Sequence, residues 1–94
     1  KPLPAERARE WGLINDVLPA EQLEEKVRQV ADLIASKAPL AVMKAKEGIG
    51  MYGASLEETL NFEAETSAGL LDTDDVREGV AAFKEKRQPV FQGR

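Results

Sequence analysis

Phe83 and Lys86 are the two residues whose types and spacing offer the most specific chemistry in this chain. They lie three residues apart, so on a helix their side chains would leave from neighbouring parts of one face. An aromatic ring beside an ammonium group suits a ligand in which a flat base carries a phosphate. In the alternative interpretation, Phe83 fills the core next to Val80 and Lys86 is solvated. Spacing alone favours this alternative.

The acidic cluster at residues 72–75 is a second candidate, because carboxylates are calcium ligands. An EF-hand would need a third oxygen ligand where Val76 stands and a glycine where Arg77 stands. We therefore predict no metal site here and expect Thr73 or Asp74 to cap a helix.

No catalytic residue is predicted within these 94 residues. The chain has no histidine and no cysteine, so it lacks the usual general base near neutral pH, the usual zinc ligand and any thiolate. Paired carboxylates could do acid or base chemistry, but on exposed helix faces such pairs are usually solvated. The pairs are Glu24/Glu25, Glu57/Glu58 and Glu63/Glu65.

The composition, with 43% hydrophobic and 32% charged residues, is typical of one small soluble unit. No run approaches the roughly 18 apolar residues that span a bilayer, and the opening residues contain no apolar targeting segment. We expect no membrane partner and a cytoplasmic location, with the mitochondrial matrix or another organelle as alternatives.

Charge also restricts the partners. The net charge of −4 argues against a nucleic-acid partner. Four basic residues nevertheless gather near the end, and a positive end on an acidic chain can hold one small anionic ligand. They are Lys84, Lys86, Arg87 and Arg94.

The first 18 residues are expected to form a short helix from Pro4 to about Trp11, which Gly12 ends, followed by an extended segment. Residues 13–18 are apolar, partly β-branched and too few for a helix of their own. A single strand has no partner in this chain, so we expect it to pair with a sheet outside it.

Residues 19–94 carry helical patterns. Leu23, Val27, Val30 and Ile34 form one apolar stripe of a helix that ends near Pro39, where the next helix begins. That next helix is apolar all round at residues 40–43, and glycines at 48, 50 and 53 weaken its end. These glycines follow no strand and precede no Gly-Lys-Ser/Thr sequence, so no phosphate loop is predicted.

Two further helices are predicted in the second half. Ser55 and Glu58 have capping-box spacing, and the helix they begin carries an apolar stripe of Leu56, Leu60, Ala64, Ser67 and Leu71. The last helix should turn Val76, Val80 and Phe83 inward and stop at Gln88-Pro89. The predicted fold is all-α, with four to five amphipathic helices and one short extended segment.

Two segments resemble the enoyl-CoA hydratase/isomerase (crotonase) family: residues 77–94 resemble its closing segment, and residues 5–19 its exit from the catalytic core. The resemblance implies a C-terminal helical domain, with residues 1–18 leaving a missing core and residues 19–94 serving assembly. Residues 82–87 resemble the segment whose Phe and Lys approach the adenine and 3′-phosphate end of coenzyme A, commonly across a subunit interface. The resemblance thereby assigns coenzyme binding to Phe83 and Lys86.

The resemblance also implies a function. The parent enzyme would hydrate enoyl-CoA thioesters or shift their double bond, with the CoA thioester as substrate and no covalently bound cofactor. The fragment alone would be inactive and bind acyl-CoA weakly, whereas the parent would form trimers or hexamers. Residues 40–43 and the stripe of Leu60, Ala64, Ser67 and Leu71 are the candidate interfaces. The alternative is a stand-alone acidic helical protein-interaction module without catalysis.

Overall fold

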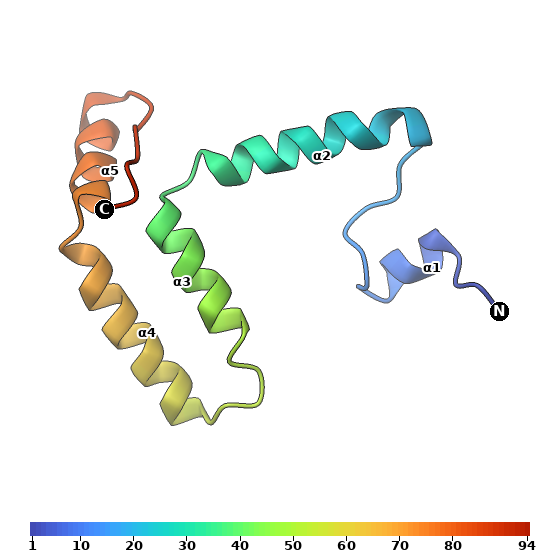
Figure 1. The fold of residues 1–94 in the computed structure, drawn as a ribbon, viewed down its shortest axis with the longest axis horizontal. Coiled ribbons are helices and arrows are strands. Elements are labelled where there is room, and N and C mark those ends of the chain that lie inside the picture. The colour runs from blue at the N-terminus through green and yellow to red at the C-terminus, as the bar shows by residue number, and fades with distance from the viewer. The chain divides into compact units, whose positions relative to one another are not determined.

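The computed structural model describes residues 1–94 and contains five helices and no strand (Figure 1). They are α1 (Ala5–Glu10), α2 (Ala20–Ala35), α3 (Pro39–Ile49), α4 (Leu56–Leu71) and α5 (Asp74–Glu85). The predicted all-α fold is confirmed. The chain divides into two compact units, residues 1–31 and 32–94.

In the first unit, Gly12 terminates α1 as predicted, two residues after the last helical residue, Glu10. Gly12 has a φ of +74°, its N–H donates to the Arg9 carbonyl, and the Leu13 N–H donates to the Ala8 carbonyl. These two bonds complete the left-handed C-terminal cap that favours glycine. Residues 13–15 then form bends and residues 16–19 have no regular structure. The segment expected to be extended therefore forms no strand, because it has no neighbouring strand with which to pair.

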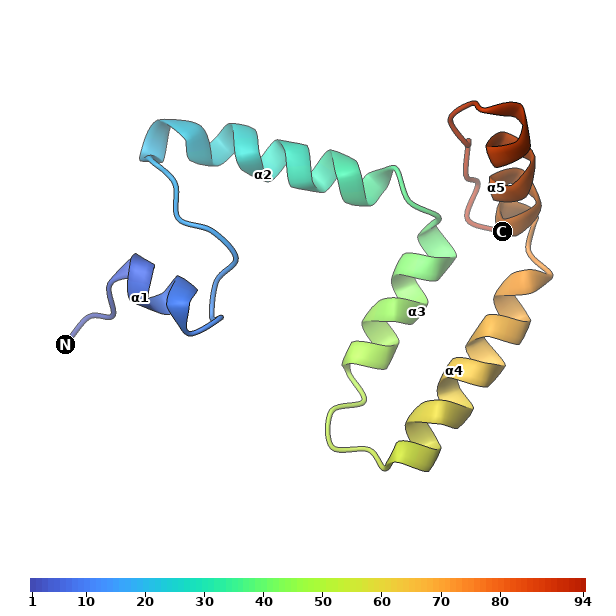
Figure 2. The same ribbon diagram turned by 180° about the vertical axis from the view of Figure 1, so that it is seen from behind.

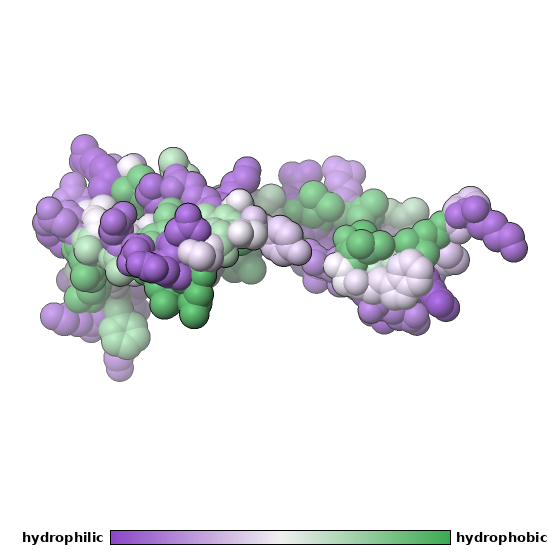
Figure 3. Space-filling view, turned by 90° about the horizontal axis from the view of Figure 1, so that it is seen from below, coloured by the Kyte–Doolittle hydropathy of each residue, from purple (hydrophilic) through white to green (hydrophobic).

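The predicted stripe of α2 lies at the surface. Leu23, Val27 and Ile34 are each more than half exposed. Throughout the chain, the only buried apolar residues are Ala8 and Ala82. Figure 3 accordingly shows hydrophobic residues, in green, at the molecular surface. None of the helices is both long and apolar enough to cross a bilayer.

In the second unit, α3 and α4 form an antiparallel hairpin, seen from both sides in Figures 1 and 2. Gly48 of α3 faces Phe62 of α4, and a Cβ atom at position 48 would lie 3.3 Å from the Phe62 ring. The absence of a side chain at Gly48 therefore lets the two helices approach. The predicted capping box starts α4, with Ser55 Oγ accepting from the Glu58 N–H and Glu58 Oε2 accepting from the Ser55 N–H.

The face of α4 that packs on α3 differs from its most apolar stripe. The half-buried residues that follow one side of α4 are Thr59, Phe62, Thr66 and Leu70. The stripe of Leu60, Ala64, Ser67 and Leu71 remains open, with Leu60 53% and Leu71 70% exposed. This candidate interface is therefore an uncovered surface in the chain.

Helix α5 begins as predicted and ends earlier than predicted. Thr73 Oγ1 accepts a hydrogen bond from the Val76 N–H, so Thr73 is the N-cap. The helix stops at Glu85 rather than at Gln88-Pro89, because Lys86 adopts the left-handed conformation with a φ of 55°. The Lys86 N–H then donates to the Phe83 carbonyl and the Arg87 N–H to the Ala82 carbonyl.

The predicted inner stripe of α5 is wrong. Phe83 is 86% exposed and Val80 50% exposed, whereas Asp75 and Ala82 are buried. The reason is the C-terminal tail, residues 87–94, which turns back along α5 in Figures 1 and 2. The Phe91 ring lies against Gly79, where a Cβ atom would be 3.7 Å away from it. The tail therefore covers the face of α5 that carries its small and acidic residues.

Candidate functional site

The predicted pair Phe83 and Lys86 lies at the C-terminal end of α5, and both side chains are exposed. The interpretation in which Phe83 fills the core is therefore wrong for this chain. Lys86 stands one residue beyond the helix, so the helical spacing assumed for the pair ends before it. The direction of the lysine side chain is set instead by its left-handed backbone.

A carboxylate on α5 holds the residues that follow this turn. Glu78 accepts hydrogen bonds from both terminal nitrogens of Arg87, at 2.5 and 3.0 Å, and from the Val90 N–H at 2.9 Å. Arg87 Nε also lies 2.6 Å from a Glu85 carboxylate oxygen. The residues on both sides of Lys86 are thereby fixed, although Lys86 itself takes part in none of the ion pairs of the chain.

The electrostatics of this cluster follow from those bonds. Hydrogen bonds from the Arg87 guanidinium and from the Val90 N–H lower the pKa of Glu78 to about 2. The carboxylates of Glu78 and Glu85 in turn raise the pKa of Arg87. Glu78 and Arg87 are therefore both charged near neutral pH. Arg87 has two carboxylate partners, so Lys86 is the cation of this turn that remains available to an anionic ligand.

The end of the tail is held by Asp75, which is buried with 3% exposure. Its two carboxylate oxygens accept from the Gln92 and Gly93 N–H groups at 2.6 and 2.8 Å, and its own N–H donates to the Arg94 carbonyl. Gly93 also lies close to Pro39, which begins α3. Asp75 thus ties the tail to the start of α5.

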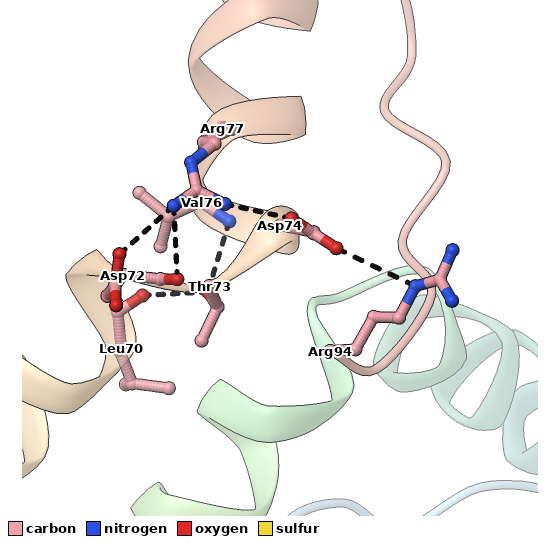
Figure 4. A network of polar contacts seen from close by, with 7 residues as sticks. All are labelled: Leu70, Asp72, Thr73, Asp74, Val76, Arg77 and Arg94. Atoms are coloured by element: carbon pink, nitrogen blue, oxygen red, sulfur yellow. Dashed lines mark hydrogen bonds and ion pairs between the residues drawn. The ribbon is translucent and has the colours of Figure 1, made fainter.

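The other acidic residues of the cluster at 72–75 have structural partners (Figure 4). Arg77 donates to Asp72 and Asp74 at 3.0 and 2.8 Å, and Arg94 lies 3.7 Å from Asp74. Thr73 connects α4 to α5, because its hydroxyl donates a hydrogen bond to the Leu70 carbonyl. No group of three or more potential metal ligands is gathered in the chain.

The second unit also contains an apolar groove of about 360 Å³ between α3 and α4. Phe62 and Leu70 of α4 line it on one side, with Ala45 and Gly48 of α3 on the other. Its lining contains no gathered set of catalytic side chains, since Lys44, Glu63 and two threonines are its polar members. The lining of the groove is therefore mainly apolar.

Comparison with known proteins decides the family. The family model described as enoyl-CoA hydratase/isomerase matches residues 1–94. The chain belongs to this family. The predicted resemblance to the enoyl-CoA hydratase/isomerase family is thus confirmed over the whole chain.

Individual members of the enoyl-CoA hydratase/isomerase family agree with the match. The chain is 39% identical to methylmalonyl-CoA decarboxylase of Escherichia coli, covering 98% of this chain and 36% of that protein. It is 36% identical to a probable mitochondrial enoyl-CoA hydratase of Dictyostelium discoideum, covering 98% and 34%. A solved enoyl-CoA hydratase/isomerase from Mycobacterium abscessus superposes with a TM-score of 0.92 at 42% identity, covering 100% of this chain and 39% of that one. The chain thus spans about a third of the length of these relatives.

Sequence reasoning missed the roles of Glu78 and Asp75 at this site. Their partners lie 9 to 18 residues away, beyond the reach of helical periodicity. Pro89, three residues after the left-handed Lys86, is the one local signal that the chain turns back at this point.

Proposed function

We propose that this chain is the C-terminal helical part of an enoyl-CoA hydratase/isomerase family enzyme. In that protein, residues 1–18 leave the catalytic core and residues 19–94 serve oligomerisation and cover the adenosine end of coenzyme A. The family match over all 94 residues carries this proposal. No observation favours the alternative of a stand-alone interaction module.

The enzyme acts on a CoA thioester by hydration or by isomerisation of the double bond. The relatives named above act, by their names, on CoA esters. Such reactions place charge on the thioester oxygen, which requires preorganised hydrogen-bond donors. The 94 residues carry no histidine and no cysteine, which removes the usual general base and any thiolate, so we expect the chain alone to be inactive. An assay of the isolated chain with an enoyl-CoA thioester tests this, and turnover above background contradicts it.

Phe83 and Lys86 contact the adenine and phosphate end of the coenzyme. The exposed Phe83 ring and the unpaired Lys86 ammonium support this assignment. A stacked base contributes about 1–3 kcal/mol and a charge-assisted hydrogen bond about 1.5–3 kcal/mol. After the entropy of association is subtracted, binding by the isolated chain is weak, on the order of millimolar.

The test of this contact compares two substrates of the full-length enzyme. Phe83→Ala and Lys86→Ala should raise KM for an enoyl-CoA thioester about tenfold. KM for the matching enoyl-pantetheine thioester, which lacks the nucleotide, should not change. Lys84→Ala is the matched control, because Lys84 is another exposed lysine two residues away. An unchanged KM for enoyl-CoA in both variants would show that the contact is assigned wrongly.

The exposed apolar faces form the contacts of a trimer, or of two stacked trimers. Leu60, 53% exposed in the middle of the α4 stripe, supports this role. Leu60→Glu should shift the full-length enzyme toward monomers in analytical ultracentrifugation. Asn61→Glu adds the same charge at the neighbouring exposed position and should leave the oligomer intact. Equal behaviour of the two variants would exclude this face as the interface.

The cytoplasmic location stays a prediction.

A further inference from the structure

Lys86 has a left-handed backbone conformation, which residues with a Cβ atom rarely adopt. Its φ of 55° makes it the only non-glycine residue with positive φ in the chain. Left-handed backbone at a residue with a Cβ atom is unfavourable, and it persists where surrounding contacts hold it. The contacts that hold Lys86 in this conformation therefore indicate the role of the turn.

Two backbone bonds close the turn, from the Lys86 N–H to the Phe83 carbonyl and from the Arg87 N–H to the Ala82 carbonyl. The side-chain contacts around the turn converge on Glu78. Its carboxylate binds Arg87, the residue directly after Lys86, and the N–H of Val90 farther along the tail. Glu78 lies on α5, two turns before the helix ends. One side chain thus joins the rigid helix to both ends of the segment in which the chain reverses. The Glu78 side chain is 25% exposed and the Arg87 side chain 40% exposed, so these bonds are only partly shielded from solvent.

We propose that Glu78 is a positioning residue for the coenzyme contact, because it holds the reversal at Lys86 and thereby fixes the direction in which the lysine side chain leaves the backbone. This inference rests on the proposed function of Phe83 and Lys86. Glu78 does not touch the ligand. It acts through Arg87 and Val90, and Arg87, already bound to two carboxylates, contributes fixed geometry rather than a free positive charge.

The charge of Glu78 matters to this role. Two guanidinium N–H groups and one amide N–H point at its two oxygens. Glu78→Gln keeps the size of the side chain but replaces one oxygen by an N–H₂ donor, which faces another donor. The low pKa of Glu78 is consistent with this arrangement of three donors around a carboxylate.

The experiment measures kcat and KM of the full-length Glu78→Gln enzyme with both substrates described above. KM for enoyl-CoA should rise about 3- to 10-fold, with kcat within about twofold of the parent. KM for the enoyl-pantetheine thioester should stay unchanged, since it has no nucleotide to contact the turn. Glu85→Gln is the matched control, because it removes the other carboxylate of Arg87 without touching Val90. Its effect should be smaller.

A double variant separates positioning from general destabilisation. If Glu78 acts through Lys86, then Glu78→Gln should change KM for enoyl-CoA less than about twofold when Lys86 is already alanine. Full additivity, or an equal rise of KM for both substrates, overturns the inference. So does an unchanged KM in Glu78→Gln while Lys86→Ala raises it, and that result leaves the proposed function standing. An unchanged KM in both Phe83→Ala and Lys86→Ala overturns the proposed function itself, and this inference with it.

Discussion

The Gly93 N–H donates to the Asp75 carboxylate at 2.8 Å across a separation of 18 residues. Asp75 stands in the first turn of α5 and Gly93 next to the last residue of the tail. Because the Gln92 N–H binds the other carboxylate oxygen, one buried side chain anchors the end of the tail to the beginning of the helix. Glu78 repeats this arrangement one turn later with Arg87 and Val90.

Asp75→Asn should release the end of the tail. Asparagine offers one acceptor where two amide donors converge, so one partly buried N–H loses its partner at a cost of about 1 kcal/mol. Amide hydrogen exchange at Gln92 and Gly93 should accelerate accordingly. Asp74→Asn is the control, because Asp74 is 59% exposed and its pairs with Arg77 and Arg94 lie at the surface. Equal exchange in the two variants would contradict the anchoring role of Asp75.

Lys86→Gly should stabilise the protein while weakening its contact with coenzyme A. Glycine adopts positive φ without the steric cost that a Cβ atom imposes, which is worth about 1 kcal/mol. Lys86→Ala keeps that cost and removes only the ammonium group. The melting temperature should therefore be higher in Lys86→Gly but not in Lys86→Ala, whereas KM for enoyl-CoA should rise in both variants. A lower melting temperature in Lys86→Gly would show that the lysine side chain stabilises the turn.

Glu78 should make the free energy of unfolding depend on pH. Its pKa is about 2 in the folded chain and near 4.5 otherwise, so the unfolded chain binds a proton first as the pH falls. The stabilisation is complete above about pH 5 and is lost as the pH approaches about 2. Urea midpoints of parent and Glu78→Gln proteins should differ at about pH 6 and converge toward about pH 3. A difference that stays constant over this range would argue against the ion pair.

Thr73→Ala should weaken the start of α5. The hydroxyl accepts from the Val76 N–H and donates to the Leu70 carbonyl, so it joins the end of α4 to the start of α5. Loss of an N-cap costs about 1 kcal/mol. Thr73→Ser keeps the hydroxyl and should be close to neutral in chemical denaturation. A Thr73→Ser variant as unstable as Thr73→Ala would assign the effect to the lost methyl group instead.

The helices and their caps were predictable because they depend on residues three or four apart. Gly12 ends α1, and Ser55 with Glu58 starts α4, as their spacing indicates. These signals are local, since a cap is a hydrogen bond between a side chain and the nearest turn. The family was predictable for a related reason, because residues 77–94 form a recognisable run of sequence.

Which face of α5 is covered was not predictable, because the face that the tail covers is not the most apolar face of the helix. By hydrophobicity alone, Val80 and Phe83 should face inward, yet both are at least half exposed. The tail selects the opposite face, where Gly79 leaves room for the Phe91 ring and Asp75 satisfies its amides. Helical periodicity identifies an apolar stripe but contains no information about which surface a distant segment will cover.

The sequence by itself therefore determined the helix boundaries set by local caps, the absence of the side chains most used in catalysis, and the family. Only the tertiary structure decided that Phe83 is exposed, that Lys86 turns the chain with a left-handed backbone, and that Glu78 and Asp75 hold the tail. The physical reason is distance along the chain. Hydrogen bonds between residues 9 to 18 positions apart form only when the chain folds back on itself.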